Sequence, residues 1–262
     1  MSDEQPANGP ASPGGPGSSS PGEATLPSGL VSAVVNLVNT GPVLLGAYTI
    51  AELIAVDAIV DFLEARPSDE VLAEAVRSLA ARELLLAGST SDQVQVRGDL
   101  GIAVAFQQRA RMVLDARATG TGEGEPWRIL LLPQPERICM IVRIDALGVH
   151  QIGLYTFDNA LQMLLDWLPK GSAAEGGREV DADALLSGSE RSALVTVTQY
   201  TAEGSAEIAG ESTDLVVVRH DGRLHLLNRD PQSPERLVRT GEQGRDGARN
   251  RITELLSKAP AA

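Results

Sequence analysis

Histidines and one cysteine are the side chains of this chain best suited to metal binding or catalysis. His220 and His225 flank Asp221-Gly222, a strong two-residue hairpin signal, so both imidazoles are expected on one face of the hairpin. A zinc site needs about three or four ligands. Because the only other histidine, His150, lies in a different predicted unit, we expect no metal site.

Cys139 and a glycine-rich loop offer no better reaction centre. Cys139 lies inside an apolar run, where a thiol acts as a small buried hydrophobe, and a single cysteine excludes an intrachain disulfide. Gly120, Gly122 and Gly124 are closely spaced, but no strand precedes them and no helix start follows, as a dinucleotide-binding loop requires. We interpret this segment as a flexible loop.

Catalytic motifs are otherwise missing from the sequence. It contains no nucleophile elbow, phosphate loop, HExxH helix or paired CxxC. The carboxylates of its predicted helices fall where a solvated face belongs, so no acid–base pair stands out. We therefore predict a non-enzymatic protein with no catalytic residues and no cofactor.

Composition limits the possible partners. The 262 residues include 35 acidic and 22 basic side chains, and the net charge of −13 opposes binding to nucleic acid or anionic lipid. The longest apolar stretch, residues 50–63, is interrupted by acidic residues and is shorter than the roughly 20 residues of a membrane span. With no secretory signal at the start, we expect a cytoplasmic protein with no nucleic-acid and no membrane partner.

Composition shifts divide the chain into four parts. A Gly/Pro/Ser tail over residues 1–28 is expected to be disordered, because it has too little apolar surface to offset the entropy of ordering. Residues 29–169 hold a helical region and a first β-meander with its helix. A small, polar linker follows over residues 170–190, and residues 191–262 form a second β-meander with its helix.

The helical region is predicted to begin with a capping box at Thr49-Ile-Ala-Glu52, which opens a helix to about Glu64. A second helix should run from Pro67 and Ser68 to near Gly88. Its core-facing stripe is predicted to contain Leu72, Ala75, Val76 and Leu79.

After this helix we expect a short edge strand at residues 93–97 and a third helix over about residues 99–117. The inward positions of the third helix are predicted to be Ala103, Phe106, Ala110, Val113 and Leu114.

Each meander reads as hydrophobic strands joined by tight turns. The predicted strands are residues 127–132, 137–144 and 149–155 in the first unit, and 193–200, 215–219 and 223–227 in the second. Asp158 is the expected N-cap of the first closing helix, and the second closing helix spans about residues 244–258. The first closing helix should cover the sheet with Leu161, Leu164, Leu165 and Leu168.

Pairing of the edge strands of the two units would protect both from aggregation. The predicted fold is therefore α+β, a pseudo-twofold pair of antiparallel β-meander-plus-helix units that form a central sheet, with an N-terminal helical subdomain.

A known family has a similar order of segments. From Pro67 to Pro169, the runs PSDEVLAEAVRSLAARELLL, QVQVRGDL, ARMVLDAR, WRILLLP, ERICMIVRIDALGVHQIGLYTF and DNALQMLLDWLP resemble the first half of the EspG family. These are cytosolic chaperones associated with ESX (type VII) secretion. The resemblance implies two related halves, a central antiparallel sheet, no catalysis, and binding of the apolar tip of a helical PE–PPE substrate. The second helical bundle of that family is reduced here to residues 180–191.

The second unit is the predicted partner surface. Residues 231–258 carry six basic and four acidic side chains, a net of +2 in an acidic chain. Arginines begin the closing helix, where the helix dipole prefers carboxylates, so helix stability does not explain them. The predicted partner-binding residues are His220, Arg223, His225, Arg245, Arg249 and Arg251.

The leading hypothesis is a non-enzymatic cytosolic chaperone or adaptor whose partner is a protein client, such as a helical secretion substrate. One alternative is a winged-helix-like transcriptional regulator built on residues 50–117, which the acidic side chains of its would-be recognition helix disfavour. Another alternative is a small-molecule sensor or enzyme with a pocket between the two units.

Overall fold

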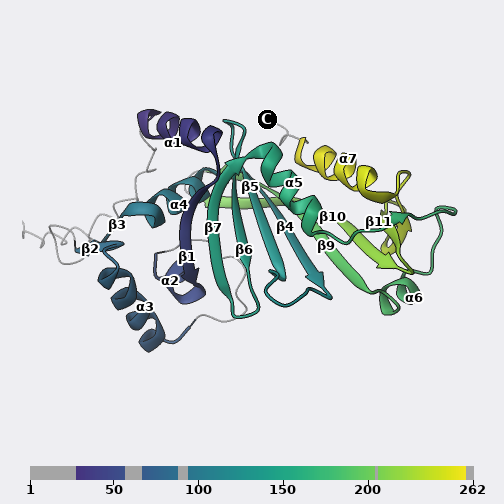
Figure 1. The fold of residues 1–262 in the computed structure, drawn as a ribbon, viewed down its shortest axis with the longest axis horizontal. Coiled ribbons are helices and arrows are strands. Elements are labelled where there is room, and N and C mark those ends of the chain that lie inside the picture. Colours follow the sequence, from purple (N-terminus) through teal and green to yellow (C-terminus); the bar gives the residue numbers. More distant parts are fainter. Residues whose placement is uncertain (1–27, 57–66, 88–93, 204–205, 258–262) are drawn as a thin grey trace, which may run out of the picture.

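The computed structural model describes residues 28–56, 67–87, 94–203 and 206–257 (Figure 1). The fold is α+β, as predicted: one ten-stranded sheet carries helices on both faces, and a separate two-stranded sheet lies in the helical region. The helices are α1 (Ser28–Thr40), α2 (Ile50–Ala55), α3 (Asp69–Ala81), α4 (Gly98–Arg109), α5 (Phe157–Trp167), α6 (Ala182–Ser187) and α7 (Gly244–Ser257).

The strands of the large sheet follow the order β1-β7-β6-β5-β4-β9-β10-β11-β12, and β8 pairs with β11. Strands β2 and β3 form the small sheet. The strands are β1 (Val43–Thr49), β2 (Leu85–Ala87), β3 (Val94–Val96), β4 (Met112–Thr119), β5 (Arg128–Pro133), β6 (Ile138–Ile144), β7 (Val149–Thr156), β8 (Ser172–Ala173), β9 (Arg191–Glu203), β10 (Ala206–His220), β11 (Arg223–Asp230) and β12 (Ser233–Arg239).

Two successive meanders build this sheet. Strands β4 to β7 are followed by α5, and strands β9 to β12 are followed by α7, so both units have four strands and a closing helix in the same order. The units join where β4 pairs antiparallel with β9, from Met112 opposite Gln199 to Thr119 opposite Ser192. The predicted continuous sheet is thus confirmed, whereas the pseudo-twofold relation stays a prediction.

The two closing helices share one face of the sheet, where α5 lies over the first unit and α7 over the second (Figure 1). One apolar cluster runs through both units and both helices. The predicted inward leucines Leu161, Leu164, Leu165 and Leu168 are all buried in it. Because the cluster contains residues of β4 and β9 alike, burial of apolar surface holds the two units together.

The opposite face is covered unevenly. Helices α1 to α4 bury a second cluster against strands β1, β5, β6 and β7 of the first unit. On the second unit only a small cluster forms there, between α6 and strands β10 and β11, centred on Leu185, Val218 and Leu227. Residues 170–190, predicted as a linker, therefore contribute a strand and a helix to the second unit.

The prediction of one helix over residues 99–117 is wrong. Helix α4 ends at Arg109, and the chain turns at Ala110 into β4, which lies between β5 and β9. Ala103, Phe106, Ala110 and Leu114 are buried as expected, but Leu114 is buried in a strand. The run MVLDARAT has no strong local preference, so pairing on both sides decides its conformation.

Some helix boundaries also differ. The capping box at Thr49 and Glu52 is confirmed, with both of its hydrogen bonds present. The second helix ends at Ala81 rather than near Gly88, because Glu83 takes a positive φ of 59° and β2 follows at once. Within its predicted stripe, Ala75 and Leu79 are buried but Val76 is exposed. Thr156, not Asp158, caps α5, since its hydroxyl accepts a hydrogen bond from the backbone amide of Asn159.

The remaining differences concern strands. Strands β1 and β12 were not predicted, and β10 begins at Ala206, nine residues before the predicted start at Leu215. The Asp221-Gly222 hairpin is confirmed, with His220 opposite Arg223. The helix that begins at the capping box, α2, ends at Ala55 with Val56 as its C-cap, so its predicted end at Glu64 is wrong. The predicted tail up to residue 27 and the positions Glu64, Gly88, Gln93 and Lys258 lie outside the described residues.

Candidate functional site

The predicted partner-binding residues fall at two separate places in the second unit. His220, Arg223 and His225 lie in the β10–β11 hairpin, and the rings of the two histidines meet edge to face with centroids 6.4 Å apart. His225 is buried, and desolvation, followed by the positive charge of Arg239, lowers the pKa of its imidazole. His150 belongs to β7, in the other unit, and no group of three potential metal ligands occurs among the described residues.

The three arginines of α7 all have partners within the chain. Arg245 forms an ion pair with Asp166 of α5, and Arg249 donates a hydrogen bond to the side chain of Gln162 on the same helix. Arg251 pairs with Glu254, one turn further along α7. Arg245 and Arg249 therefore connect the closing helices of the two units, a role that sequence reasoning missed.

Cys139 and the loop of residues 120–124 both have surroundings that indicate a structural role. Cys139 is fully buried in β6, and this burial raises the pKa of its thiol. The loop from Gly120 to Gly124 directly follows β4, so the expectation that no strand precedes it is wrong, and the next element is strand β5 rather than a helix. The loop closes back on Glu125, whose carboxylate accepts a hydrogen bond from the amide of Gly122. These surroundings suit packing rather than nucleophilic chemistry.

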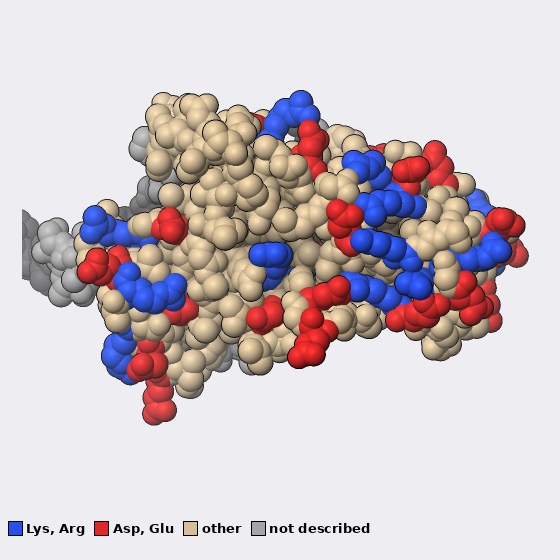
Figure 2. All heavy atoms as spheres, in the orientation of Figure 1, with Lys and Arg blue, Asp and Glu red and all other residues tan. Residues whose placement is uncertain are grey.

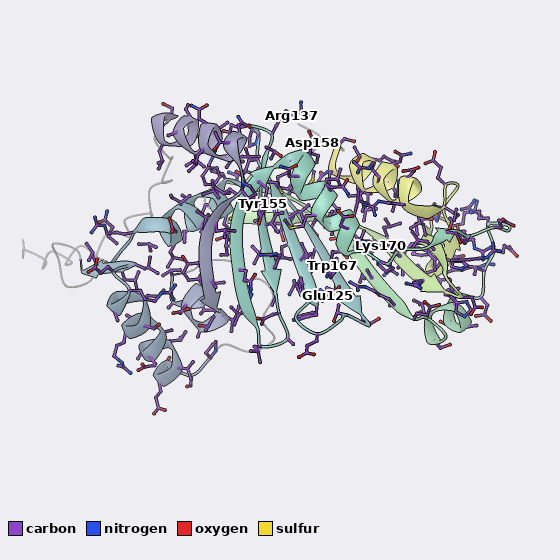
Figure 3. The ribbon with its side chains drawn as sticks, viewed as in Figure 1. Glu125, Arg137, Tyr155, Asp158, Trp167 and Lys170 are labelled. Carbon is purple, nitrogen blue, oxygen red and sulfur yellow. The ribbon has the colours of Figure 1, made fainter. Side chains whose placement is uncertain are left out.

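Arg191 ties this loop to α5. Its guanidinium donates to the Glu125 carboxylate and to the carbonyl oxygen of Trp167, each over 2.7 Å. Figure 3 shows Glu125 and Trp167 beside each other next to strand β4. Hydrogen bonding to Gly122, and then to Arg191, lowers the pKa of the Glu125 carboxyl. The carboxylate is thus kept in its charged, acceptor form and fixes the loop.

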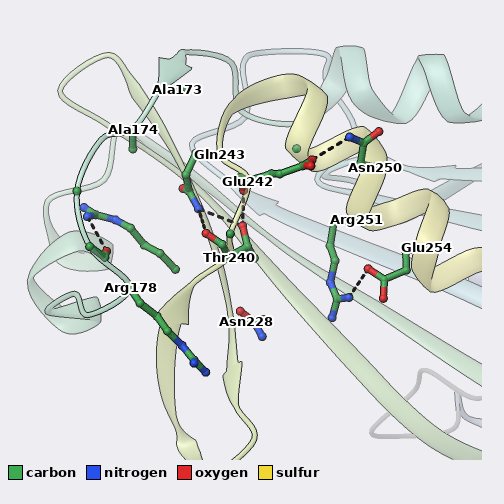
Figure 4. A pocket seen from close by; sticks show the side chains of 15 residues that line it. Ala173, Ala174, Arg178, Asn228, Thr240, Glu242, Gln243, Asn250, Arg251 and Glu254 are labelled. Atoms are coloured by element: carbon green, nitrogen blue, oxygen red, sulfur yellow. Dashed lines mark hydrogen bonds and ion pairs between the residues drawn. The ribbon is translucent and has the colours of Figure 1, made fainter.

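A cavity of about 900 Å³ opens beside α7, inside the second unit rather than between the two units (Figure 4). Its walls come from the loop after β8, from β11 and β12, and from the first turns of α7. Polar and charged side chains contribute much of the lining, namely Arg178, Asn228, Arg239, Thr240, Glu242, Gln243, Asn250, Arg251 and Glu254.

A second, apolar groove of about 250 Å³ lies at the β1 edge of the sheet, on the face that carries α5. Leu44, Ala47, Ile141 and Tyr155 provide apolar walls, and Arg143 and Gln151 stand at one end. Leu44 is 67% exposed, unusually high for a leucine in a strand. Since β1 ends the order of the sheet, this groove lies beside a strand with one neighbour among the described residues.

Two glycines shape the groove. At Gly46 the pairing of β1 with β7 shifts by a bulge, and its φ of +113° suits glycine because a Cβ would approach the Tyr48 hydroxyl to 2.8 Å. Gly153, opposite Leu44 in β7, presents no side chain between Leu44 and Tyr155. Leu44 therefore points outward while its neighbour Leu45 is completely buried on the other face.

The surface around the groove carries little charge. Figure 2 shows a broad uncharged area over β1, β7 and β6, interrupted by an isolated basic patch, whereas acidic and basic groups crowd the second unit. Arg143 lines the groove and donates a hydrogen bond to the Gln151 side chain over 3.0 Å. It has no ion pair with any carboxylate of the described residues. The sequence signal for this groove was the motif VLLGAYT, an apolar strand interrupted by glycine.

No helix of the described residues is both long and apolar enough to cross a bilayer. No protein-family model matches the chain, and no curated protein matches it.

Proposed function

We propose that the protein is a non-enzymatic chaperone or adaptor of the EspG type, which binds a helical protein client. The observation that carries this proposal is the apolar groove at the β1 edge, with Leu44 exposed beside Tyr155 and Gly153. Exposed apolar patches next to an open strand edge are typical of surfaces that bind other proteins. A client would bury the leucine, which gains roughly 1.5–3 kcal/mol of transfer free energy.

The lining of the groove favours a peptide segment over a small metabolite. Its walls are apolar, its floor is the backbone of a strand, and its only charged side chain is Arg143. A helix or strand with two or three apolar side chains fits such a shallow surface, and an acidic residue at its end would pair with the guanidinium.

The order of the elements agrees with this proposal. Two four-stranded meanders, each closed by a helix, form a sheet that is continuous through β4 and β9. A continuous sheet of this kind presents an extended surface for a protein client. The helical secretion substrate remains the client class that the resemblance suggests.

The direct test is co-expression of the tagged chain with the proteins encoded by its neighbouring genes, followed by affinity purification. Retention of a small helical protein by the wild-type chain, and its loss from Leu44→Glu, are the expected results. Leu147→Glu is the matched control, because Leu147 is 89% exposed in the turn at the opposite end of β7. Equal retention by both variants would remove the groove as the client site.

A further inference from the structure

The cavity beside α7 has a charge arrangement that the client-binding proposal does not use. Of its three arginines, Arg251 is neutralised by Glu254, with Nη1 and Oε2 2.6 Å apart. The other acidic lining residue, Glu242, accepts a hydrogen bond from Asn250 over 2.8 Å. In Figure 4, one wall of the cavity is formed by α7 and the segment before it, which carry Glu242, Asn250, Arg251 and Glu254. Arg178 and Asn228 lie on the other wall.

The uncompensated positive charge lies on the wall formed by β12 and the loop after β8. Arg239 forms no ion pair with any carboxylate of the described residues, and its Nε is buried without a hydrogen-bond partner there. Arg178, in the loop, forms an ion pair with Asp230 at 3.4 Å, and its own side chain is 63% exposed. The backbone amide of Arg239 donates a hydrogen bond to the carbonyl oxygen of Arg178, which joins β12 to the loop at this wall.

The guanidinium of Arg239 is held in place by neutral groups. Its Nη1 donates to the carbonyl oxygen of Gly177 over 3.3 Å, and its Nη2 lies 3.3 Å from Nδ1 of His225. Burial, and then the charge of Arg239, lowers the pKa of the His225 imidazole, so its Nδ1 is available as an acceptor. Neutral partners fix the position of the cation without cancelling its charge.

Glycine is required next to this group. Gly176 has a φ of +119°, and a Cβ there would lie 2.5 Å from Nη1 of Arg239. The loop after β8 therefore passes directly over the guanidinium, and Gly176, Gly177 and Arg239 together line the cavity. A volume of about 900 Å³ is within the range of pockets that bind small molecules.

We propose that this cavity is a binding site for a small anionic ligand, whose carboxylate or phosphate group pairs with Arg239. A planar guanidinium without a carboxylate partner is suited to bidentate pairing with either anion. Hydroxyl groups of the ligand would find acceptors in the side-chain amide oxygens of Asn228 and Asn250. The site is independent of the apolar groove, which lies at the other end of the sheet.

The test is isothermal titration of the full chain at low ionic strength with two probes, inorganic phosphate and citrate. Saturable binding of at least one probe is expected, and the probe that binds better identifies the acidic group that the site prefers. Arg239→Gln should weaken binding about tenfold or more, which is the usual loss for a hydrogen bond to a charged group. Arg236→Gln is the matched control, since Arg236 is on the same strand but pairs with Glu179 outside the cavity.

A second variant protects the test against a folding defect in Arg239→Gln. Asn228→Asp places a carboxylate on the cavity wall at an exposed position and should weaken anion binding by repulsion, without loss of thermal stability. The proposal is overturned if neither probe binds at about 10 mM, which corresponds to a negligible affinity. It is also overturned if Asn228→Asp binds the probes as the wild-type chain does, or if Arg236→Gln weakens binding as much as Arg239→Gln.

Discussion

Arg245 of α7 and Asp166 of α5 form an ion pair across the boundary between the two units, with Nη2 and Oδ1 2.6 Å apart. The hydrogen bond from Arg245, followed by that from Gln162, lowers the pKa of the Asp166 carboxyl. The first arginine of α7 therefore has an intramolecular role, which accounts for a basic residue at a helix start that the dipole disfavours.

Reversal of Arg245 to Glu should lower the thermal midpoint slightly, because it brings two carboxylates together at a largely exposed position. The double exchange Arg245→Glu with Asp166→Arg should recover most of this loss. Thermal unfolding of Arg245→Glu, Asp166→Arg and the double variant gives the coupling free energy between the two residues. Additive effects would show that the pair does not contribute to the contact between α5 and α7.

A separate prediction concerns the basic surface for an acidic client. If Arg245 and Arg249 also attract such a client, the double reversal to Glu should slow association, more strongly at low salt. Gln162→Ala is the control, since it removes the internal partner of Arg249 without reversing any charge. The measurement is the association rate of the co-purifying client with the wild-type chain and the double variant. An unchanged rate would show that Arg245 and Arg249 do not attract the client.

Burial of Leu164 connects α5 to the cluster shared by both units. Leu164→Ala should therefore destabilise the protein by about 2–5 kcal/mol, the range for truncation of a fully buried leucine. Leu147→Ala, at an exposed turn, should change the free energy of unfolding by less than about 0.5 kcal/mol. Denaturant melts compare the two, and similar midpoints would contradict the packing of α5 on the sheet.

A buried ion pair supports the centre of the sheet. Arg128 of β5 contacts Asp115 of β4 through two hydrogen bonds of 2.7 and 2.8 Å, and both residues are buried. Asp115→Ala leaves a buried guanidinium without this carboxylate and should cost about 3–5 kcal/mol. Arg117→Ala removes a more exposed partner of the same carboxylate and should cost about 1 kcal/mol or less. Equal losses in denaturant melts would contradict this difference.

Acid sensitivity should arise in part from His150, whose pKa is lowered by burial in β7. The unfolded chain binds the proton more readily, so this group contributes full stability above about pH 6.5 and less as the pH falls through its folded pKa. His150→Gln should make the decline in unfolding free energy between about pH 6.5 and pH 5 less steep. Denaturant melts at both pH values measure it, with about pH 7.5 as the reference at which the imidazole is neutral. An unchanged decline would contradict the burial of a neutral imidazole.

Local patterns predicted part of this fold well. The capping box at Thr49, the Asp221-Gly222 hairpin and the leucine face of α5 all depend on neighbours in sequence, and each is confirmed. The prediction for the segment after Arg109 was wrong because its residues suit a helix as well as a strand, and one of its partners, β9, is distant in sequence. Strand β12 was not predicted, because little of it is buried and its sequence therefore lacks an alternating apolar pattern.

The candidate sites were harder to predict than the strands. The groove depends on a bulge at Gly46 that turns Leu44 outward. The alternation of apolar and polar residues does not predict which side chains a bulged strand exposes. The cavity depends on Gly176 lying over Arg239, two residues that are 63 positions apart. Both arrangements arise from tertiary contacts alone.

The most direct test of client binding is a calorimetric titration of the helical protein that co-purifies with the chain. It compares the dissociation constants of that protein for the wild-type chain, Leu44→Glu and Leu147→Glu. Leu44→Glu should weaken binding at least about tenfold, because a charge replaces an apolar contact that the client buries. Leu147→Glu should bind as the wild-type chain does, and both variants should unfold at the wild-type temperature. Wild-type affinity in Leu44→Glu, or no measurable affinity in the wild-type chain, would contradict the proposed function.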